Sequence, residues 1–213
     1  MNPALPGRSH PLLTRLPGML FAAFMTAFIF LALWFWIDHF PINPSVSLKQ
    51  MQQNESAAFE ALNRMISAQN TYRDQSLKFS DKASYAAFLN HLWIAVDPQG
   101  NPVRHNLIPE KLGVAVGPSK AVNGYYFLDV RQRHDAATVT TETIDYQKGW
   151  AIAAIPQMAG RTGSVVMIAD QSGSIYGIPA DNYSSRFPIA PAKAGWAKLK
   201  NAKDLAVFHD DRP

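Results

Sequence analysis

The feature that most constrains this chain is an apolar run near its N-terminus, from Leu16 to Ile37, that no charged residue interrupts. Between Met19 and Ile37 the only polar side chain is Thr26, and a helix of that length would be about 28 Å long. This length matches the hydrocarbon core of a bilayer, so the sequence predicts a transmembrane helix at residues 16–38. The side chains expected to anchor it in lipid are Met19, Phe21, Ala23, Ala27, Phe30, Trp34 and Trp36.

The charges that precede this run predict its orientation. Arg8 and Arg15 lie before it, and no acidic residue occurs ahead of Asp38. Because basic residues beside a first span tend to stay in the cytoplasm, residues 1–15 are expected in the bacterial cytoplasm. The C-terminal domain is then expected in the periplasm, anchored in the inner membrane. A cleaved signal peptide is the alternative, although the run exceeds the roughly 7–15 apolar residues of a signal core.

The composition limits the remaining classes of protein. The chain contains no cysteine, so a domain outside the cytoplasm must depend on an ordinary hydrophobic core rather than on disulfides. Its 20 basic and 16 acidic residues are spread along the chain and give no indication of nucleic-acid binding. The densest basic stretch, from Lys193 to Lys203, is either a solvated face or a contact with anionic lipid or an acidic partner.

Two helices are expected after the membrane span. Pro41 and Pro44 break any continuous helix at a Pro-rich hinge, residues 39–46, because proline removes a backbone donor. A long amphipathic helix is expected from Ser45 or Ser47 to about Gln75, and a shorter one from Asp81 to about Trp93. The long helix has Glu55 on one of its polar sides, and its apolar face contains Phe59, Leu62, Met65, Ile66, Gln69 and Tyr72.

The second half of the chain has the pattern of antiparallel strands. Segments rich in β-branched and aromatic residues predict strands at residues 125–130, 138–146, 150–155, 164–169 and 174–178. The run from Asp170 to Gly173 predicts a hairpin turn between the last two. The expected fold class is therefore α+β, with a single N-terminal transmembrane helix. A domain at residues 47–180 packs the long helix on an antiparallel β-meander, and an irregular Pro- and Lys-rich arm follows at residues 181–213.

Four segments of the predicted domain share features with one known family. The segment from Ala58 to Tyr72 ends in Ala-Gln-Asn-Thr-Tyr, and Gly124 to Phe127 opens the strand region. Trp150 to Pro156 and Ile168 to Tyr176 supply the later strands. Together they resemble the helix and the closing meander of bacterial type IV pilins, type II secretion pseudopilins and related secreted pilin-like proteins. The resemblance covers residues 55–180 and implies a pilin-like domain.

Departures from that family argue against a filament subunit. Pilins are cut after a glycine, for which Gly18 is the candidate, and usually carry a glutamate at the fifth position of the mature chain. Ala23 lies at that position here. Pro41 and Pro44 also interrupt the helix that in pilins continues into the globular part. We therefore expect a pilin-like domain on a separate anchor, and the alternative is a pseudopilin processed after Gly18.

No pattern in the sequence indicates catalysis, a metal or a cofactor. The six histidines are spaced so that neither a helix nor a strand would pair them as metal ligands. Ser164 lacks the flanking residues of a nucleophile elbow. Asp170, Asp181 and Asn182 offer oxygen atoms of the kind that calcium binds, but they do not follow an EF-hand pattern, so turn and cap roles are expected. The chain is expected to be non-enzymatic, with no catalytic, cofactor-binding or metal site.

Binding of partner proteins is the expected function, since aromatic side chains in an arm bury large areas with few rotatable bonds. The expected contact residues are Tyr183, Phe187, Trp196, Lys198, Lys200 and Phe208. The sequence thus predicts a structural accessory subunit of a multi-subunit bacterial membrane complex, bioenergetic or secretory. Its expected partners are other integral membrane subunits, their periplasmic domains and membrane lipid, without nucleic acid. A membrane-anchored hydrolase or a small-molecule binding protein is a further alternative.

Overall fold

The structure, a computed structural model, describes residues 48–76, 82–97, 99–135 and 138–209. These residues belong to one compact unit, Val46–Pro213. The predicted cytoplasmic segment, membrane span and Pro-rich hinge all fall within residues 1–47 and lie outside the described residues. Within the described ranges, no helix combines the length and the apolar character needed to cross a bilayer.

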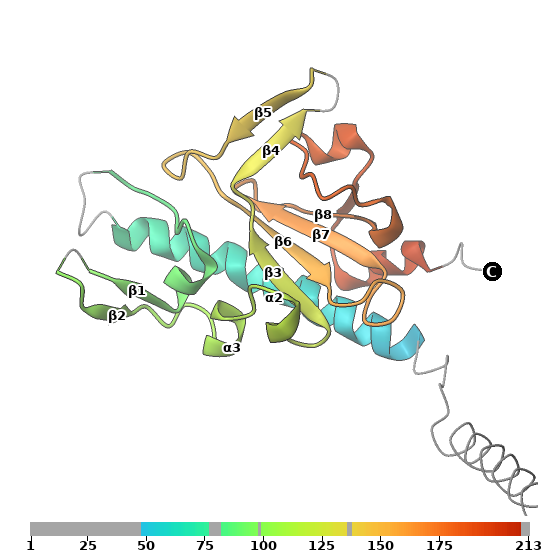
Figure 1. The fold of residues 1–213 in the computed structure, drawn as a ribbon, viewed down its shortest axis with the longest axis horizontal. Coiled ribbons are helices and arrows are strands. Elements are labelled where there is room, and N and C mark those ends of the chain that lie inside the picture. The colour runs from blue at the N-terminus through green and yellow to red at the C-terminus, as the bar shows by residue number, and fades with distance from the viewer. Residues whose placement is uncertain (1–47, 77–81, 98, 136–137, 210–213) are drawn as a thin grey trace, which may run out of the picture. The chain divides into compact units, whose positions relative to one another are not determined.

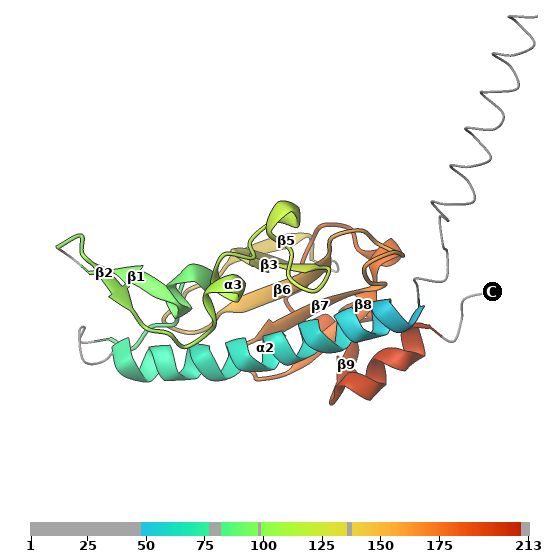
Figure 2. The same ribbon diagram turned by 90° about the horizontal axis from the view of Figure 1, so that it is seen from below.

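Helix α2 (Leu48–Ser76) confirms the long amphipathic helix that the sequence predicts. It contains neither glycine nor proline, and Arg73 in its last turn interacts favourably with the helix dipole. Leu62 and Met65, which lie on its apolar face, are completely buried. Figure 2 shows α2 lying along the central β-sheet, and its apolar residues share one hydrophobic cluster with the sheet, so the helix forms one layer of the fold.

The central layer is a five-stranded antiparallel sheet in the order β3-β6-β7-β8-β9 (Figure 1). Its strands are β3 (Tyr125–Asp129), β6 (Ala151–Pro156), β7 (Val165–Asp170), β8 (Ile175–Pro179) and β9 (Ala197–Leu199). The first four confirm predicted strands. Every residue of β6 and β7 is buried, which explains why these two strands are nearly continuous apolar runs rather than alternating ones. Gly173, with φ of 71°, closes the predicted hairpin between β7 and β8.

Side chains of the sheet alternate between two hydrophobic clusters, one on each face. On β7, Met167 points into the cluster that contains the apolar face of α2, whereas Val166 and Ile168 point into the other. The second cluster is closed by Phe187 and Trp196 from the C-terminal region. Both faces of the sheet are therefore covered.

Two short ribbons and several single turns complete the described unit. The ribbons pair β1 (Ile94–Val96) with β2 (Pro102–Arg104), and β4 (Gln132–Asp135) with β5 (Thr140–Thr143). The strand predicted at residues 138–146 is thus reduced to β5. The helical turns before β3 are η1 (Leu89–Leu92), α3 (Glu110–Gly113) and η2 (Pro118–Lys120).

The short helix predicted from Asp81 to Trp93 is wrong, because only η1 is helical in its described part. Tertiary hydrogen bonds explain the difference. The Tyr85 N–H donates to the Tyr146 carbonyl over 2.8 Å. The side chain of Gln69 on α2 binds both backbone groups of Ala86, at 2.9 and 3.0 Å. These bonds hold the segment extended, so they outweigh its helical apolar pattern.

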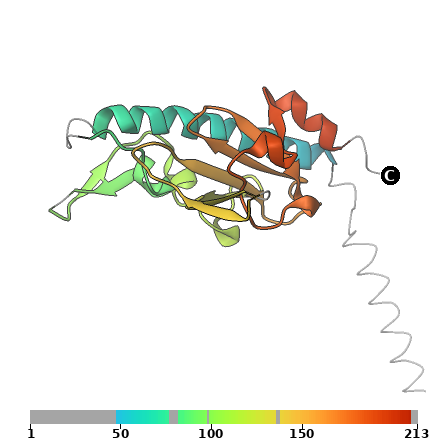
Figure 3. The same ribbon diagram turned by 90° about the horizontal axis from the view of Figure 1, so that it is seen from above.

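The C-terminal region is regular where the sequence predicts an irregular arm. Its elements are η3 (Ala180–Asn182), η4 (Pro191–Ala194), β9 and η5 (Ala202–Phe208). A capping box starts η5: the Asn201 side chain accepts from the Lys203 N–H, and the Asp204 carboxylate accepts from the Asn201 N–H. Figures 2 and 3 both show η5 beside the N-terminal half of α2.

The expected fold class is therefore wrong. The described chain is mostly β-sheet carrying one long helix, and no described helix can span a membrane. The expected arm instead extends the sheet through β9 and fills the core on both faces. The expected α+β layout with an irregular arm is corrected accordingly for the described residues, whereas the predicted membrane span at residues 16–38 lies outside them.

Candidate functional site

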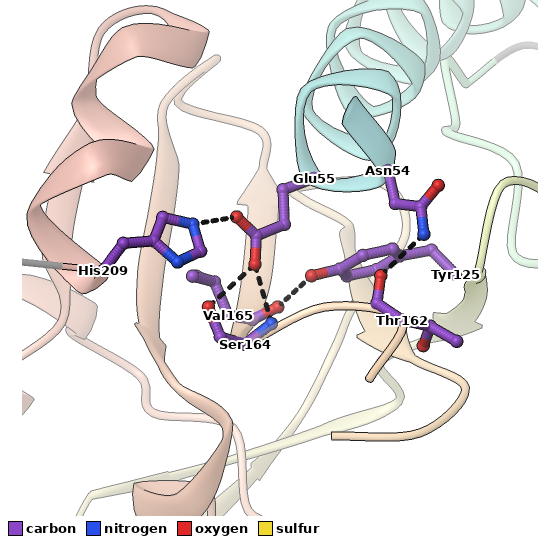
Figure 4. Close-up of polar contacts among 7 residues, drawn as sticks. All are labelled: Asn54, Glu55, Tyr125, Thr162, Ser164, Val165 and His209. Carbon is purple, nitrogen blue, oxygen red and sulfur yellow. Dashed lines mark hydrogen bonds and ion pairs between the residues drawn. The ribbon is translucent and has the colours of Figure 1, made fainter. Parts of the chain in front are cut away.

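The most concentrated polar chemistry in the described residues surrounds the carboxylate of Glu55, which is 0% exposed. One oxygen, Oε1, accepts the Ser164 N–H at 2.7 Å and the Ser164 hydroxyl at 2.8 Å. The other, Oε2, lies 2.6 Å from Nε2 of His209. Figure 4 shows these three side chains converging from α2, from the residue before β7 and from the residue after η5. We call them the Glu55 cluster.

Close backbone packing places Ser164 beneath α2. The Asn54 side-chain amide donates to the Thr162 carbonyl over 2.9 Å, which ties the loop before β7 to the helix. The Tyr125 hydroxyl donates to the Val165 carbonyl over 2.8 Å (Figure 4). A Cβ at Gly163 would collide with the Tyr125 ring, so this position requires glycine.

The hydrogen-bond geometry of the cluster shows which of its groups donate. Nδ1 of His209 is buried and has no hydrogen-bond partner among the described residues. Because a carboxylate can only accept, Nε2 carries a proton and donates it to Oε2 of Glu55. Burial, and then the nearby Glu55 charge, raise the pKa of Tyr125, so its phenol remains a protonated donor.

The order of groups in the cluster does not match a Ser-His-Asp triad. In that triad the serine hydroxyl contacts the histidine, and the acid lies behind the histidine. Here the carboxylate lies between Ser164 and His209, and all three residues are at least nine-tenths buried. The arrangement instead joins three segments that are far apart in the sequence.

A groove on the other side of the sheet is the candidate binding site. It has a volume of about 570 Å³ and lies between the β4–β5 ribbon and the segment from Ile178 to Trp196. Its lining includes His134, Thr141, Tyr183, Arg186, Phe187 and Trp196. We call it the ribbon groove.

Backbone hydrogen bonds hold the two walls of the ribbon groove together. The His134 N–H donates to the Phe187 carbonyl at 2.7 Å, and the Ile189 N–H donates to the His134 carbonyl at 3.0 Å. The imidazole Nδ1 of His134 lies 3.0 Å from the Thr141 hydroxyl. An ion pair joins the ribbon to the sheet: the Arg133 guanidinium on β4 lies 3.8 Å from the Asp170 carboxylate on β7, and both side chains are nearly buried.

Three aromatic rings form the base of the groove. The ring centroids of Tyr183 and Phe187 are 5.3 Å apart, and Trp196 lies 6.5 and 6.4 Å from them. Burial, and then the neighbouring Tyr126, raise the pKa of Tyr183 to about 12. The Tyr183 phenol is therefore neutral at physiological pH and offers a hydrogen bond beside an apolar surface.

The predicted contact residues take different positions. Phe187 and Trp196 are 8% and 6% exposed and belong to the core, and Phe208 packs partly buried against the α2 face. Tyr183 lines the ribbon groove, while Lys198 and Lys200 are exposed on and after β9. The aromatic side chains are held by the chain's own core because the expected arm is folded onto the sheet. The anchor residues predicted between Met19 and Trp36 lie outside the described residues.

The sequence interpretation missed Glu55 as a buried residue, although a signal was present. Glu55 precedes Phe59 by four positions and Leu62 by seven, so it continues the apolar stripe of α2. The oxygen donors considered for calcium do not converge. Asp170 pairs with Arg133 and also accepts the Ser172 N–H in the turn. Within the described residues, no group of three or more metal-ligating side chains occurs.

Comparison with protein-family models, with curated proteins and with solved structures finds no match to this chain. The resemblance to pilins and pseudopilins therefore stays a prediction from sequence, and the function proposed below does not depend on it.

Proposed function

We propose that this chain is a non-enzymatic accessory subunit that binds another polypeptide through the ribbon groove. The observation that carries the proposal is the groove itself: an aromatic base bordered by polar side chains, on a unit whose other face is covered by α2. Surfaces that combine aromatic rings with a polar rim are typical of protein interfaces. The enclosed Glu55 cluster supports a non-enzymatic role, since its three residues are buried and its serine hydroxyl contacts the carboxylate rather than the histidine.

Site-specific photo-crosslinking in the native host tests this proposal. A photoreactive residue is placed at Ser184 in the full chain, because Ser184 is exposed and lines the groove. The matched control has the same residue at Ser67, an exposed serine on α2. We expect one defined protein adduct from position 184 that is weak or missing from position 67. Equal labelling at both positions, or no adduct at 184, would refute the proposal.

Binding of a small molecule in the same groove is the second candidate. Its volume lies within the range of roughly 300–1,000 Å³ that is typical of ligand pockets. His134 and Arg186 offer polar contacts there, beside the aromatic base. A thermal-shift screen of small polar compounds distinguishes the two: a stabilising compound that also blocks the adduct at position 184 would favour this candidate.

A further inference from the structure

The register of the β4–β5 ribbon shows which backbone groups face outward. The Ile144 N–H donates to the Arg131 carbonyl over 3.0 Å, which defines one hydrogen-bonded pair. In an antiparallel ladder such pairs alternate, so Arg133 faces Glu142 in the next one. His134, between these pairs, directs its backbone to Phe187 and Ile189 on the other side. By the same alternation, the residues opposite on β5 direct their backbone groups away from β4.

The outward groups belong to Thr141 and Thr143. Each presents an N–H and a C=O on the free side of β5, and no other described strand pairs there. All four residues of β5 are exposed, and Figure 1 shows the strand on the outside of the ribbon. Such an edge is complementary to one kind of partner, an extended polypeptide backbone. Thr140 and Thr141 also line the ribbon groove, so a strand added here would run along its rim.

The charge on β5 disfavours a second copy of this chain as the partner. A symmetric antiparallel pair that satisfies both threonines would place Glu142 of one chain directly opposite Glu142 of the other. Like charges at directly opposed positions are destabilising. The cross-strand neighbour Arg133 forms its ion pair with Asp170, and Glu142 has no ion pair within the described residues. The Glu142 carboxylate is therefore complementary to a basic residue on another protein.

We propose that β5 receives an extended segment of a different polypeptide, which adds to the ribbon as an antiparallel third strand. The segment carries a lysine or arginine opposite Glu142 and β-branched residues beside the two outward threonines. This inference rests on the proposed function, because it states how the partner bound at the groove is recognised. Affinity comes from main-chain hydrogen bonds to Thr141 and Thr143, and selectivity comes from the charge of Glu142 and from the groove.

Hydrogen exchange of the full chain, alone and in the complex trapped at position 184, tests the geometry directly. The Thr141 and Thr143 amides should exchange rapidly in the free chain and at least about tenfold more slowly in the complex. The Thr140 and Glu142 amides point toward β4 and serve as internal references that should change little. If Thr141 and Thr143 exchange equally fast in both states, strand addition is refuted, although binding at the groove stands.

Variants at one position separate the backbone from the side chain. Thr143→Pro removes an outward N–H and is tolerated on an edge strand, whereas Thr143→Val keeps that N–H. We expect Thr143→Pro to reduce adduct formation at position 184 about tenfold and Thr143→Val to change it less than about twofold. Glu142→Lys should also weaken the adduct, and equal adduct yields for the proline and valine variants would refute the inference. If the proline variant fails to fold, the exchange measurement decides, and a wild-type chain with no adduct at all refutes both proposals.

Discussion

Replacing Glu55 by glutamine should destabilise the fold strongly, because every contact of its carboxylate is specific. If the amide oxygen keeps the two bonds from Ser164, the new NH₂ group faces Nε2 of His209 at a site where the present contact is 2.6 Å. The imidazole must then accept, so its proton moves to Nδ1, which is buried without a partner. The variant loses a charge-assisted hydrogen bond and leaves a buried donor unsatisfied, for a total of about 2–4 kcal/mol.

Urea and thermal unfolding, followed by fluorescence of the buried Trp150, measure this loss. For a unit of this size, about 3 kcal/mol corresponds to a fall in Tm of roughly 6–12 °C. Glu60→Gln is the matched control on the same helix, since Glu60 is exposed and should change the free energy of unfolding by less than about 0.5 kcal/mol.

Replacing His209, which contacts the other oxygen of the Glu55 carboxylate, tests the same hydrogen bond independently. His209→Ala leaves the Glu55 carboxylate buried with only Ser164 as a donor, so the free energy of unfolding should fall by about 3 kcal/mol or more. The two changes remove the same contact, so the double variant should lose less than the sum of the single losses, by about 0.5–3 kcal/mol. Glu55→Gln and His209→Ala effects that add within experimental error would refute the assignment of a shared hydrogen bond.

Other perturbations follow from single contacts, and urea unfolding measures each of them. Gln69→Ala leaves two backbone groups of the extended segment unpaired, so it should cost about 2 kcal/mol, against almost no change for the exposed Gln53→Ala. Gly163→Ala should destabilise the fold, because the new Cβ would clash with the Tyr125 ring. Gly117→Ala has open space around its Cβ and should be neutral or slightly stabilising. Burial raises the pKa of Asp129 to about 6, so its ionisation opposes folding as the pH rises above the unfolded value of 3.8. The free energy of unfolding of Asp129→Asn should therefore exceed that of wild type by an amount that grows as the pH rises from about 4 and reaches about 2 kcal/mol by pH 7.

The elements that the sequence predicts correctly are those with strong local signals. Helix α2 has a long apolar stripe without glycine or proline, and β7 and β8 are apolar runs joined by a turn with Gly173 at positive φ. Each of these patterns is complete within its own segment, so no distant residue is needed to recognise it.

The elements that the sequence misses depend on distant partners. The segment around Tyr85 and Ala86 has a helical apolar pattern but forms hydrogen bonds with Gln69 and Tyr146 instead. Strand β9 is three residues long, and its regularity comes from pairing with β8. The ribbon groove could not be predicted either, since its two walls come together only through the bonds around His134.

The Glu55 cluster explains how the C-terminal region stays folded although its sequence has little periodic pattern of apolar residues. Apolar contacts alone would let η5 pack at more than one position along α2. The buried face of α2 carries a carboxylate at only one position, Glu55. The bond to His209 closes a separation of 154 residues and so selects one register for η5. The segment that forms the base of the ribbon groove lies between β8 and β9, and β9 leads directly into η5. Fixing η5 therefore fixes the far end of the groove wall. If this holds, Glu55→Gln should accelerate amide hydrogen exchange in the segment from Tyr183 to Trp196 more than in β6. Uniform acceleration across the unit would show instead that the cluster contributes only to global stability.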